Sequence, residues 1–294
     1  MKNKSIKMRK QIDTSSRYFL LLCGTISVIT VLLITIFIVQ QGIPTFQTVS
    51  IKEFLFSTDW SPSKSDPHYG VASFVIASFE VTLLSVIFAI PIALSCAIYL
   101  SEFATGNFAK ILRSGIELLA GIPSIIYGLF GIAVVVPFVR NTFGGNGFSL
   151  LSAAIILAIM ILPTIINFSE VTIRSVPRET KNASIALGAT QWQTIKNVII
   201  PSSISGIVSS IILALGRAIG ETTAVVLVGG NAPIFASSPI DMGRTLTMNI
   251  ITDMSYASGV HMSALFATAM LLFFFILLLN LIVVLVTRKG AIHE

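Results

Sequence analysis

The sequence contains little charge. Of its 294 residues, only 11% are Asp, Glu, Lys or Arg, whereas 54% are hydrophobic. The mean hydropathy is +0.90. A soluble domain carries roughly 25% charged residues, because water must solvate its surface. The composition therefore excludes a soluble enzyme, an intrinsically disordered chain and a fibrous repeat protein. It predicts an integral membrane protein.

Sequence motifs for catalysis and metal binding are also missing. The chain has no GxxxxGK[ST] phosphate-binding loop, no HExxH, no CxxC pair and no GxSxG elbow. Its three histidines show no metal-ligand spacing, and Cys23 and Cys96 lie in apolar runs that imply no disulfide framework. We therefore expect no catalytic residue, no metal site and no cofactor bound by this chain, which we interpret as a non-enzyme.

Long apolar runs are abundant instead. Six of them cover approximately residues 18–39, 71–100, 116–139, 149–168, 203–228 and 263–286. Each has about the 20 residues that a helix needs to cross the hydrocarbon core of a bilayer. None shows the strict alternation typical of membrane barrel strands. The predicted fold class is an all-α integral membrane protein with six transmembrane helices.

The positions of the basic residues predict the orientation. If both termini are cytoplasmic, fourteen of the nineteen Lys and Arg lie on the inner side and four lie in outer loops. Inner loops of membrane proteins carry such an excess. We therefore expect residues 1–70 to form a cytoplasmic N-terminal tail, the first transmembrane helix and an outer loop. Residues 287–294 are expected to form a cytoplasmic tail.

Ionisable side chains within the predicted spans are candidates for function, because burying them in a membrane is costly. They are Glu80, Glu117, Arg217 and Glu221. Arg217 and Glu221 are four residues apart, so they share one helical face and can pair within the helix, with the Thr222 hydroxyl nearby. The pair is either a structural lock or an anion site. A guanidinium matches a tetrahedral oxyanion, and Glu221 could neutralise it until the anion arrives.

For Glu80 and Glu117 two interpretations stay open. Either carboxyl group could form an interhelical hydrogen bond, or it could line the transport path.

The inner loop, residues 169–202, carries a recognisable pattern. NASIALG (182–188) is followed by nine residues and by VIIP (198–201). This resembles the EAA signature of ABC importer permeases, although Asn182 replaces the usual Glu and Ser184 the second Ala. The resemblance implies a type I ABC importer permease fold and a short coupling helix that docks on an ATPase subunit. The residues it assigns to this coupling are Asn182, Ala183, Gly188 and Pro201. Pro201 is also expected to end the amphipathic segment before the fifth span.

Further motifs narrow the resemblance. IELLAGIPSIIYG (116–128), IMILPT (159–164), ALGATQWQT (186–194) and GRAIGET (216–222) are similar to phosphate-specific importers. YLSE (99–102) and the outer WSP (60–62) favour the PstC permeases over the sister PstA family. The resemblance covers about residues 50–286. It implies that 71–286 is the shared permease domain, and that Arg217 and Glu221 are the charged pair of the transport path.

The same resemblance implies the partners. They are a PstA-like permease in a heterodimer, a PstB-like ATPase dimer that binds ATP, and a PstS-like phosphate-binding protein. The expected function is the translocation pathway of an ATP-driven phosphate importer in a bacterial plasma membrane, with no role in nucleic-acid binding. The alternatives are an ABC permease for another oxyanion or small solute and, less favoured, an ion-coupled secondary carrier. A carrier often contains inverted repeats, which we do not detect.

Overall fold

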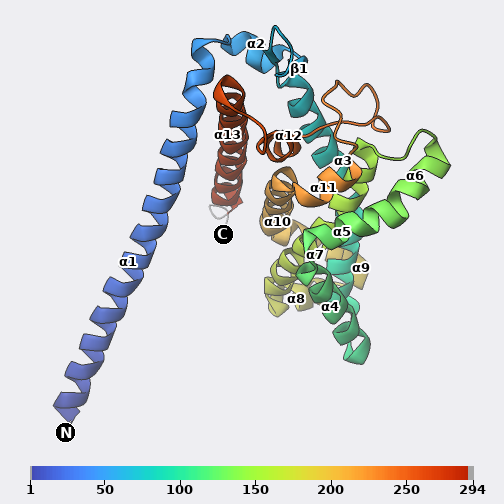
Figure 1. Ribbon diagram of the computed structural model, residues 1–294. Helices are drawn as coiled ribbons and strands as arrows, with labels where there is room; N and C mark the ends of the chain where they lie inside the picture. Colours follow the sequence, from blue (N-terminus) through green and yellow to red (C-terminus); the bar gives the residue numbers. More distant parts are fainter. Residues whose placement is uncertain (1, 291–294) are drawn as a thin grey trace.

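The computed structural model describes the backbone of residues 2–290 and the side chains of residues 13–282, 284 and 285. The predicted inner tail, 287–294, thus lies partly outside the described residues. The long helices are α1 (Lys2–Gly42), α3 (Ala72–Ile98), α4 (Gly106–Gly121), α7 (Leu150–Ser175), α10 (Ile200–Gly220) and α13 (Gly259–Gly290) (Figure 1). The shorter ones are α2 (Ile51–Phe56), α5 (Ser124–Phe130), α6 (Val136–Phe143), α8 (Arg178–Ala186), α9 (Gln191–Thr194), α11 (Thr223–Val228) and α12 (Leu246–Asp253).

Tighter and wider helical turns connect several of these elements. They are the 3-10 turn η1 (Ile43–Gln47) and the π-helical turns η2 (Tyr99–Phe103), η3 (Gly131–Val135) and η4 (Ile195–Ile199). Among the described residues, the only sheet is the hairpin of β1 (Trp60–Ser61) and β2 (His68–Tyr69), in which Trp60 faces Tyr69. The predicted all-α class is confirmed.

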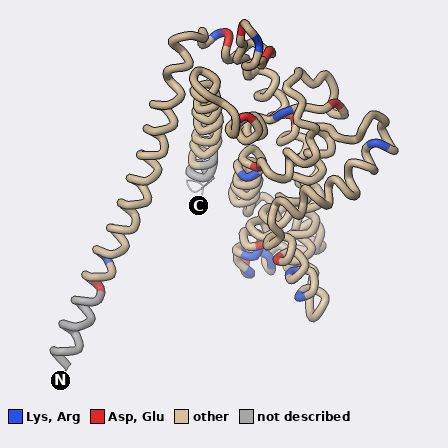
Figure 2. Tube along the Cα trace, viewed as in Figure 1, with Lys and Arg blue, Asp and Glu red and all other residues tan. Residues whose placement is uncertain are grey.

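Six helical segments are long and apolar enough to cross a membrane. They are Asp13–Gln47, Ala72–Phe103, Ser124–Phe143, Leu150–Ser175, Gln191–Gly220 and Gly259–Ile282. Charged residues gather mainly at the two ends of the bundle, with few between them (Figure 2). The first residues of α1 and helix α8 lie toward the lower part of Figure 1, and α13 runs from the top of the picture down to about its middle. This arrangement agrees with the prediction of six spans.

Helix α7 is the centre of the core and packs against α3 and α10. Small side chains make the close contact with α3 possible: Ala89 and Ala93 of α3 and Ala153 and Ala154 of α7 are all fully buried. Without a hydrophobic driving force in lipid, such small residues allow the dispersion contacts that hold membrane helices together. Ser149 begins α7 by accepting a hydrogen bond from the Ser152 amide at 3.1 Å.

The third span differs from the prediction of 116–139. Helix α4 ends at Gly121, and Ile122 and Pro123 are extended, with ψ of 127° and 143°. A residue before proline avoids the helical region, so the chain turns here instead of kinking. The candidate span is Ser124–Phe143, which leaves Glu117 on α4 outside the spans. The prediction that Glu117 lies within a span was therefore wrong.

Pro201 does not end the inner segment as predicted. The helix continues from Gln191 to Gly220, and the π-helical turn η4 precedes the proline. Its closing bond runs from the Ile200 amide to the Ile195 carbonyl, five residues back. A proline within a helix lacks a donor and clashes with the carbonyl four residues earlier, and the wider turn relieves this conflict.

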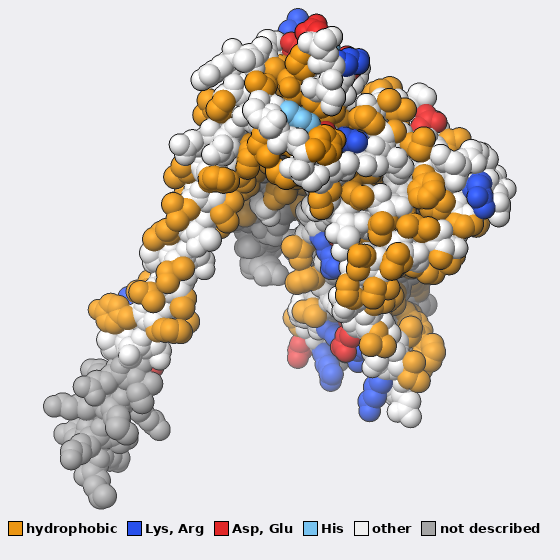
Figure 3. All heavy atoms as spheres, viewed as in Figure 1, with side chains coloured by type: hydrophobic (Ala, Val, Ile, Leu, Met, Phe, Trp, Pro, Cys, Tyr) orange, Lys and Arg blue, Asp and Glu red, His pale blue; other side chains and the backbone are white. Residues whose placement is uncertain are grey.

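Helix α1 leans away from the bundle and contacts it near its C-terminal end (Figure 1). There Gly42 approaches the Ala267 backbone so closely that a Cβ would lie 3.0 Å from its nitrogen. Phe37 packs edge-on against Phe266, with ring centroids 5.6 Å apart. Most of the helix exposes apolar side chains (Figure 3).

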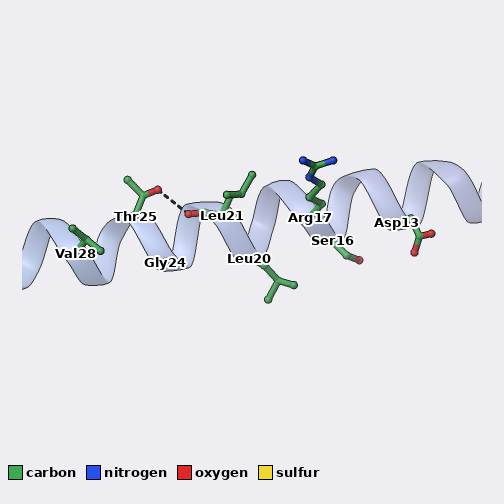
Figure 4. Close-up of a pocket in the computed structure, with 8 residues that line it drawn as sticks. All are labelled: Asp13, Ser16, Arg17, Leu20, Leu21, Gly24, Thr25 and Val28. Carbon is green, nitrogen blue, oxygen red and sulfur yellow. Dashed lines mark hydrogen bonds between the residues drawn. The ribbon is translucent and has the colours of Figure 1, made fainter. Parts of the chain in front are cut away.

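A shallow hollow between Asp13 and Val28 is lined by this one helix only, so it cannot enclose a ligand (Figure 4).

A buried hydrogen-bond cluster joins the loops that were predicted to lie outside the membrane. Asp253 Oδ1 accepts hydrogen bonds from Arg244 (3.0 Å) and the Tyr256 hydroxyl (2.6 Å). Oδ2 accepts one from the Trp60 indole (2.9 Å) and lies 3.2 Å from His261 Nε2. Burial opposes ionisation of Asp253, but these hydrogen bonds and the charge of Arg244 outweigh it and hold its pKa below the usual value. The hairpin, α12 and the start of α13 therefore form one rigid layer.

Candidate transport path and coupling segment

The fifth predicted span, 203–228, is broken where its charged residues lie. Helix α10 ends at Gly220, Glu221 is extended with ψ of 131°, and α11 begins two residues later. The Glu221 carboxylate accepts a hydrogen bond from the Ala224 amide at 3.3 Å, so it caps α11. Its backbone carbonyl accepts one from the Thr247 hydroxyl at 3.0 Å. Side chains thus satisfy backbone groups that the break leaves free.

Arg217 occupies the last turn of α10, where a cation suits the negative end of the helix dipole. Its guanidinium is exposed and donates a hydrogen bond to the Thr164 hydroxyl of α7 at 3.4 Å. The predicted pairing with Glu221 is wrong, because no ion pair joins the two among the described side chains. The helix ends between them, so the four-residue spacing no longer places them on one face.

The structure brings together only part of the predicted set. Thr222 is half-buried in the same break and donates to the Gly220 carbonyl at 3.3 Å. Glu80 is half-buried on α3, and within the described part of the chain its carboxylate has no hydrogen-bond or ion-pair partner. Glu117 is exposed on α4. Arg217, Glu221 and Thr222 therefore lie at the same helix break, although among the described side chains no hydrogen bond or ion pair joins Arg217 to the other two, or Glu80 or Glu117 to any of them.

The interior near Glu221 has almost no free space. A pocket there between α3, α7 and α10 has a volume of about 10 Å³, enough for roughly one water molecule. A tetrahedral oxyanion cannot pass through it. Since Arg217 faces outward, a solute that meets its guanidinium must travel along the surface of this chain. The arrangement favours a path completed by a second subunit.

The predicted coupling segment forms a helix, a turn and a second helix. Asn182 and Ala183 are exposed on α8, and Gly188 follows with φ of +89°, a conformation that favours glycine. Thr190 then begins α9 in a reciprocal capping box with Gln193, with bonds of 3.3 and 2.8 Å. The sequence NASIALG thus ends one helix and allows the chain to reverse.

This segment exposes large apolar side chains. Leu187 is 90% exposed, Trp192 60% and Ile185 53%, and no residue of α8 is buried. Contiguous exposed apolar side chains rimmed by polar ones indicate a protein interaction surface. The segment therefore has the character of a docking site for another protein.

Sequence reasoning did not assign a role to two groups of ion-paired side chains. Lys181 of α8 pairs with Glu102 of η2 at 2.6 Å. Arg113 of α4 and Arg174 of α7 share the Glu170 carboxylate, each at 2.9 Å. Glu102 lies within the YLSE motif, so the sequence does single it out. Its partner Lys181 is 79 residues later, and their pairing follows only from the fold.

The comparisons with known proteins agree with this geometry. The family model "binding-protein-dependent transport system inner membrane component" matches residues 89–290. The chain is 40% identical to the probable ABC transporter permease protein YqgH of Bacillus subtilis, over 86% of this chain and 84% of the relative. It is 32% identical to the phosphate transport system permease protein PstC of Xylella fastidiosa, over 74% of this chain and 73% of the relative.

Solved structures show the same fold. A MetNI methionine ABC transporter chain aligns with a TM-score of 0.61 at 20% identity, covering 75% of this chain and 95% of its own. A chain of a bacterial alginate ABC transporter aligns with a TM-score of 0.62 at 15% identity, covering 97% and 98%. The type I ABC importer permease fold and the resemblance to PstC permeases are confirmed. The chain belongs to the binding-protein-dependent transport system inner membrane components, the transmembrane subunits of ABC transporters.

Proposed function

We propose that this chain forms one half of the translocation path of an ATP-driven phosphate importer in a bacterial plasma membrane. The observation that supports the substrate most strongly is the similarity to PstC relatives over about three quarters of the chain. The exposed Arg217 supplies matching chemistry, because its planar fork of donors suits a tetrahedral oxyanion.

The break beside Arg217 explains how an anion could be bound weakly. Glu221 is engaged in capping α11, so it does not neutralise the guanidinium. The Thr164 hydroxyl accepts one of its N–H groups, and the other N–H groups of the exposed guanidinium remain available to an oxyanion. Two or three such donors give an attraction strong enough for entry, and the exposed position permits release, as conduction requires. We assign Glu80 and Glu117 no step in this path.

The subunits of the proposed complex follow from the same surfaces. A PstA-like permease would complete the path along the Arg217 face, and a PstS-like protein would deliver phosphate from outside. A PstB-like ATPase dimer would bind ATP and dock against α8 and α9, at the exposed Ile185, Leu187 and Trp192. Both termini would then lie in the cytoplasm, on the side of α8. This chain has no ATPase site of its own in this scheme.

Uptake by the reconstituted complex tests the proposal. The chain is co-expressed with its neighbouring permease, ATPase and binding protein, and the purified complex is placed in proteoliposomes with ATP inside the lumen that faces the ATPases. We expect uptake of radiolabelled phosphate that requires ATP and is not reduced by excess sulfate or molybdate. Uptake of sulfate or molybdate in place of phosphate would assign the complex to another oxyanion. Uptake that ignores ATP would refute the importer itself.

A further inference from the structure

A partly buried ion pair joins α8 to the span that contains α3. Lys181 of α8 and Glu102 of η2, the π-helical turn that follows α3, lie 2.6 Å apart, and their side chains are only 18% and 11% exposed. Charged side chains are rarely buried at a loop without a reason, since removing both from water costs several kcal/mol per ion. Solubility alone therefore does not explain why two charged side chains are placed here.

Helix α8 has few other attachments. None of its residues is buried, and Ser184 contributes its second tertiary side-chain hydrogen bond, to Thr194 of α9 at 2.9 Å. Thr194 belongs to the helix that continues into α10, so that bond ties α8 to the fifth span. Among the described side chains, Lys181–Glu102 is the one polar side-chain pair that ties α8 to the span containing α3.

The residue that receives this link is firmly held. Glu102 lies in the π-helical turn that ends α3, and its backbone carbonyl accepts a hydrogen bond from Gln191 of α9 at 3.3 Å. Two residues earlier, the Leu100 carbonyl accepts bonds from Arg174 (2.6 Å) and Arg113 (3.4 Å). A force applied at Glu102 therefore acts on a braced helix end, and π-helical turns are often found at functional positions.

The outer half of α3 reaches the break beside Arg217. The Ser78 hydroxyl of α3 accepts a hydrogen bond from the Leu246 amide of α12 at 3.0 Å. The next residue of α12, Thr247, donates to the Glu221 carbonyl at 3.0 Å. Closely packed alanines hold α3 against α7 along its length, so its two ends are joined by one continuous packed helix. A chain of direct contacts thus leads from α8 through α3 and α12 to Glu221.

We propose that the Glu102–Lys181 ion pair is the link through which movement of α8 reaches α3 and changes the helix break beside Arg217. Both are positioning residues that touch neither ATP nor the solute. This inference rests on the proposed docking of an ATPase against α8, and it deepens that proposal by naming how the movement enters the membrane helices.

The test measures whether nucleotide binding changes the helix break, independently of whether the complex assembles and of which solute it carries. A reporter cysteine replaces Thr223, the first residue of α11, in a chain in which Cys23 and Cys96 are alanine. Its rate of reaction with a thiol reagent is compared in the purified complex without nucleotide and after trapping with ATP and vanadate. Phosphate is absent from this assay. A change in rate with the unmodified ion pair shows that the reporter responds, whatever the solute proves to be.

Glu102→Gln and Lys181→Gln each remove one charge of the pair and leave the other buried without its partner. We expect the nucleotide-dependent change in rate to fall by about tenfold or more, with ATP hydrolysis and subunit composition retained. Lys181→Arg keeps the charge and should retain the change, and the exchange Glu102→Lys with Lys181→Glu should restore it. Lys110→Gln, an exposed inner lysine of α4, is the matched control for a lost positive charge.

A complete nucleotide-dependent change in an assembled Glu102→Gln complex would overturn the inference. If the exchanged pair fails to assemble, Lys181→Arg decides: a response as low as that of Lys181→Gln would also refute the role of the ion pair. Failure of the phosphate proposal is seen separately, as a wild-type complex that responds to nucleotide but takes up no phosphate.

Discussion

Arg217 and Glu221 are four residues apart and yet form no ion pair, because α10 ends at Gly220 and Glu221 caps α11. The guanidinium therefore remains available, with one hydrogen bond to Thr164. An arginine that is neutralised within its own helix would stabilise packing and nothing more. One that is exposed at a helix break can meet an anion. The break thus converts what resembles a structural salt bridge into a candidate binding group.

Arg217→Gln is expected to abolish most phosphate uptake while the complex still assembles. The substitution keeps donors at this position but removes the charge, and a hydrogen bond to a charged group contributes roughly 1.5–3 kcal/mol. Uptake should therefore fall by at least tenfold, and Arg217→Lys should restore only part of it, since an ammonium lacks the planar fork. Radiolabelled uptake and membrane abundance are measured side by side.

Arg140→Gln provides the matched control, because Arg140 is an exposed arginine at the last turn of α6, away from the break. Its uptake should equal that of the wild type. An abundant Arg217→Gln complex with normal uptake would remove Arg217 from the path.

The orientation of the chain can be measured with single cysteines. In a chain without Cys23 and Cys96, cysteines at the exposed positions Ser63 and Ser237 should react with an impermeant thiol reagent added to intact cells. A cysteine at Ala183, which is exposed on α8, should react only after the membrane is permeabilised. The basic residues predict this pattern, because they concentrate on the side of α8. Labelling of position 183 in intact cells would reverse the orientation.

The features that could be predicted well from the sequence are those that depend on long runs of apolar residues. Six apolar segments gave six spans, since length and hydropathy are summed over about 20 residues and tolerate local error. The turn within the predicted coupling segment was equally visible, because a glycine that the turn requires stands at position 188 with φ of +89°, whereas the coupling role itself stays a prediction. A short pattern suffices where one residue type is nearly obligatory.

The predictions that failed concerned single positions at which a helix either ends or continues. Pro123 separates α4 from α5, whereas Pro201 is accommodated by the π-helical turn η4, although both are prolines at the edge of an apolar run. The end of α10 at Gly220 depends on Thr247, a residue 26 positions later that satisfies the Glu221 carbonyl. Such tertiary hydrogen bonds leave no local trace, and neither does the pairing of Glu102 with Lys181.

Gly188 is expected to tolerate few other side chains despite open space around it. A Cβ there would meet nothing within 4 Å, so any effect comes from its backbone conformation. At φ of +89° a β-branched residue is strained by roughly 1–2 kcal/mol. Gly188→Val should therefore displace α8 and reduce transport and ATPase retention, whereas Gly188→Asn should retain most of both, since Asn visits this region more readily.

Co-purified ATPase and uptake are compared for the two Gly188 variants in the same membranes. Equal behaviour of Val and Asn would show that the turn carries no constraint, and the coupling role of this segment would then lack its structural basis.

Asp253 is expected to be the most sensitive position of the outer layer. Asp253→Asn leaves the buried Arg244 without its counter-ion, and breaking a buried ion pair costs roughly 3–5 kcal/mol. The purified protein should therefore unfold at a clearly lower temperature at pH 7. Asp59→Asn is the control, because Asp59 pairs with Lys64 at the surface, where an ion pair contributes at most about 1 kcal/mol.

The pH dependence gives a second test of the Asp253 cluster. Its pKa is held below the ordinary value of 3.8, so the folded state binds the proton less readily than the unfolded state. The stabilisation is thus complete above about pH 5 and is lost as the pH falls through the lowered pKa. Wild type should lose thermal stability in that acid range, and its advantage over Asp253→Asn should shrink there. If the difference between the two stayed constant from neutral pH down to pH 3, the carboxylate would not be the ionised centre of the cluster, and the outer layer would depend on its aromatic packing alone.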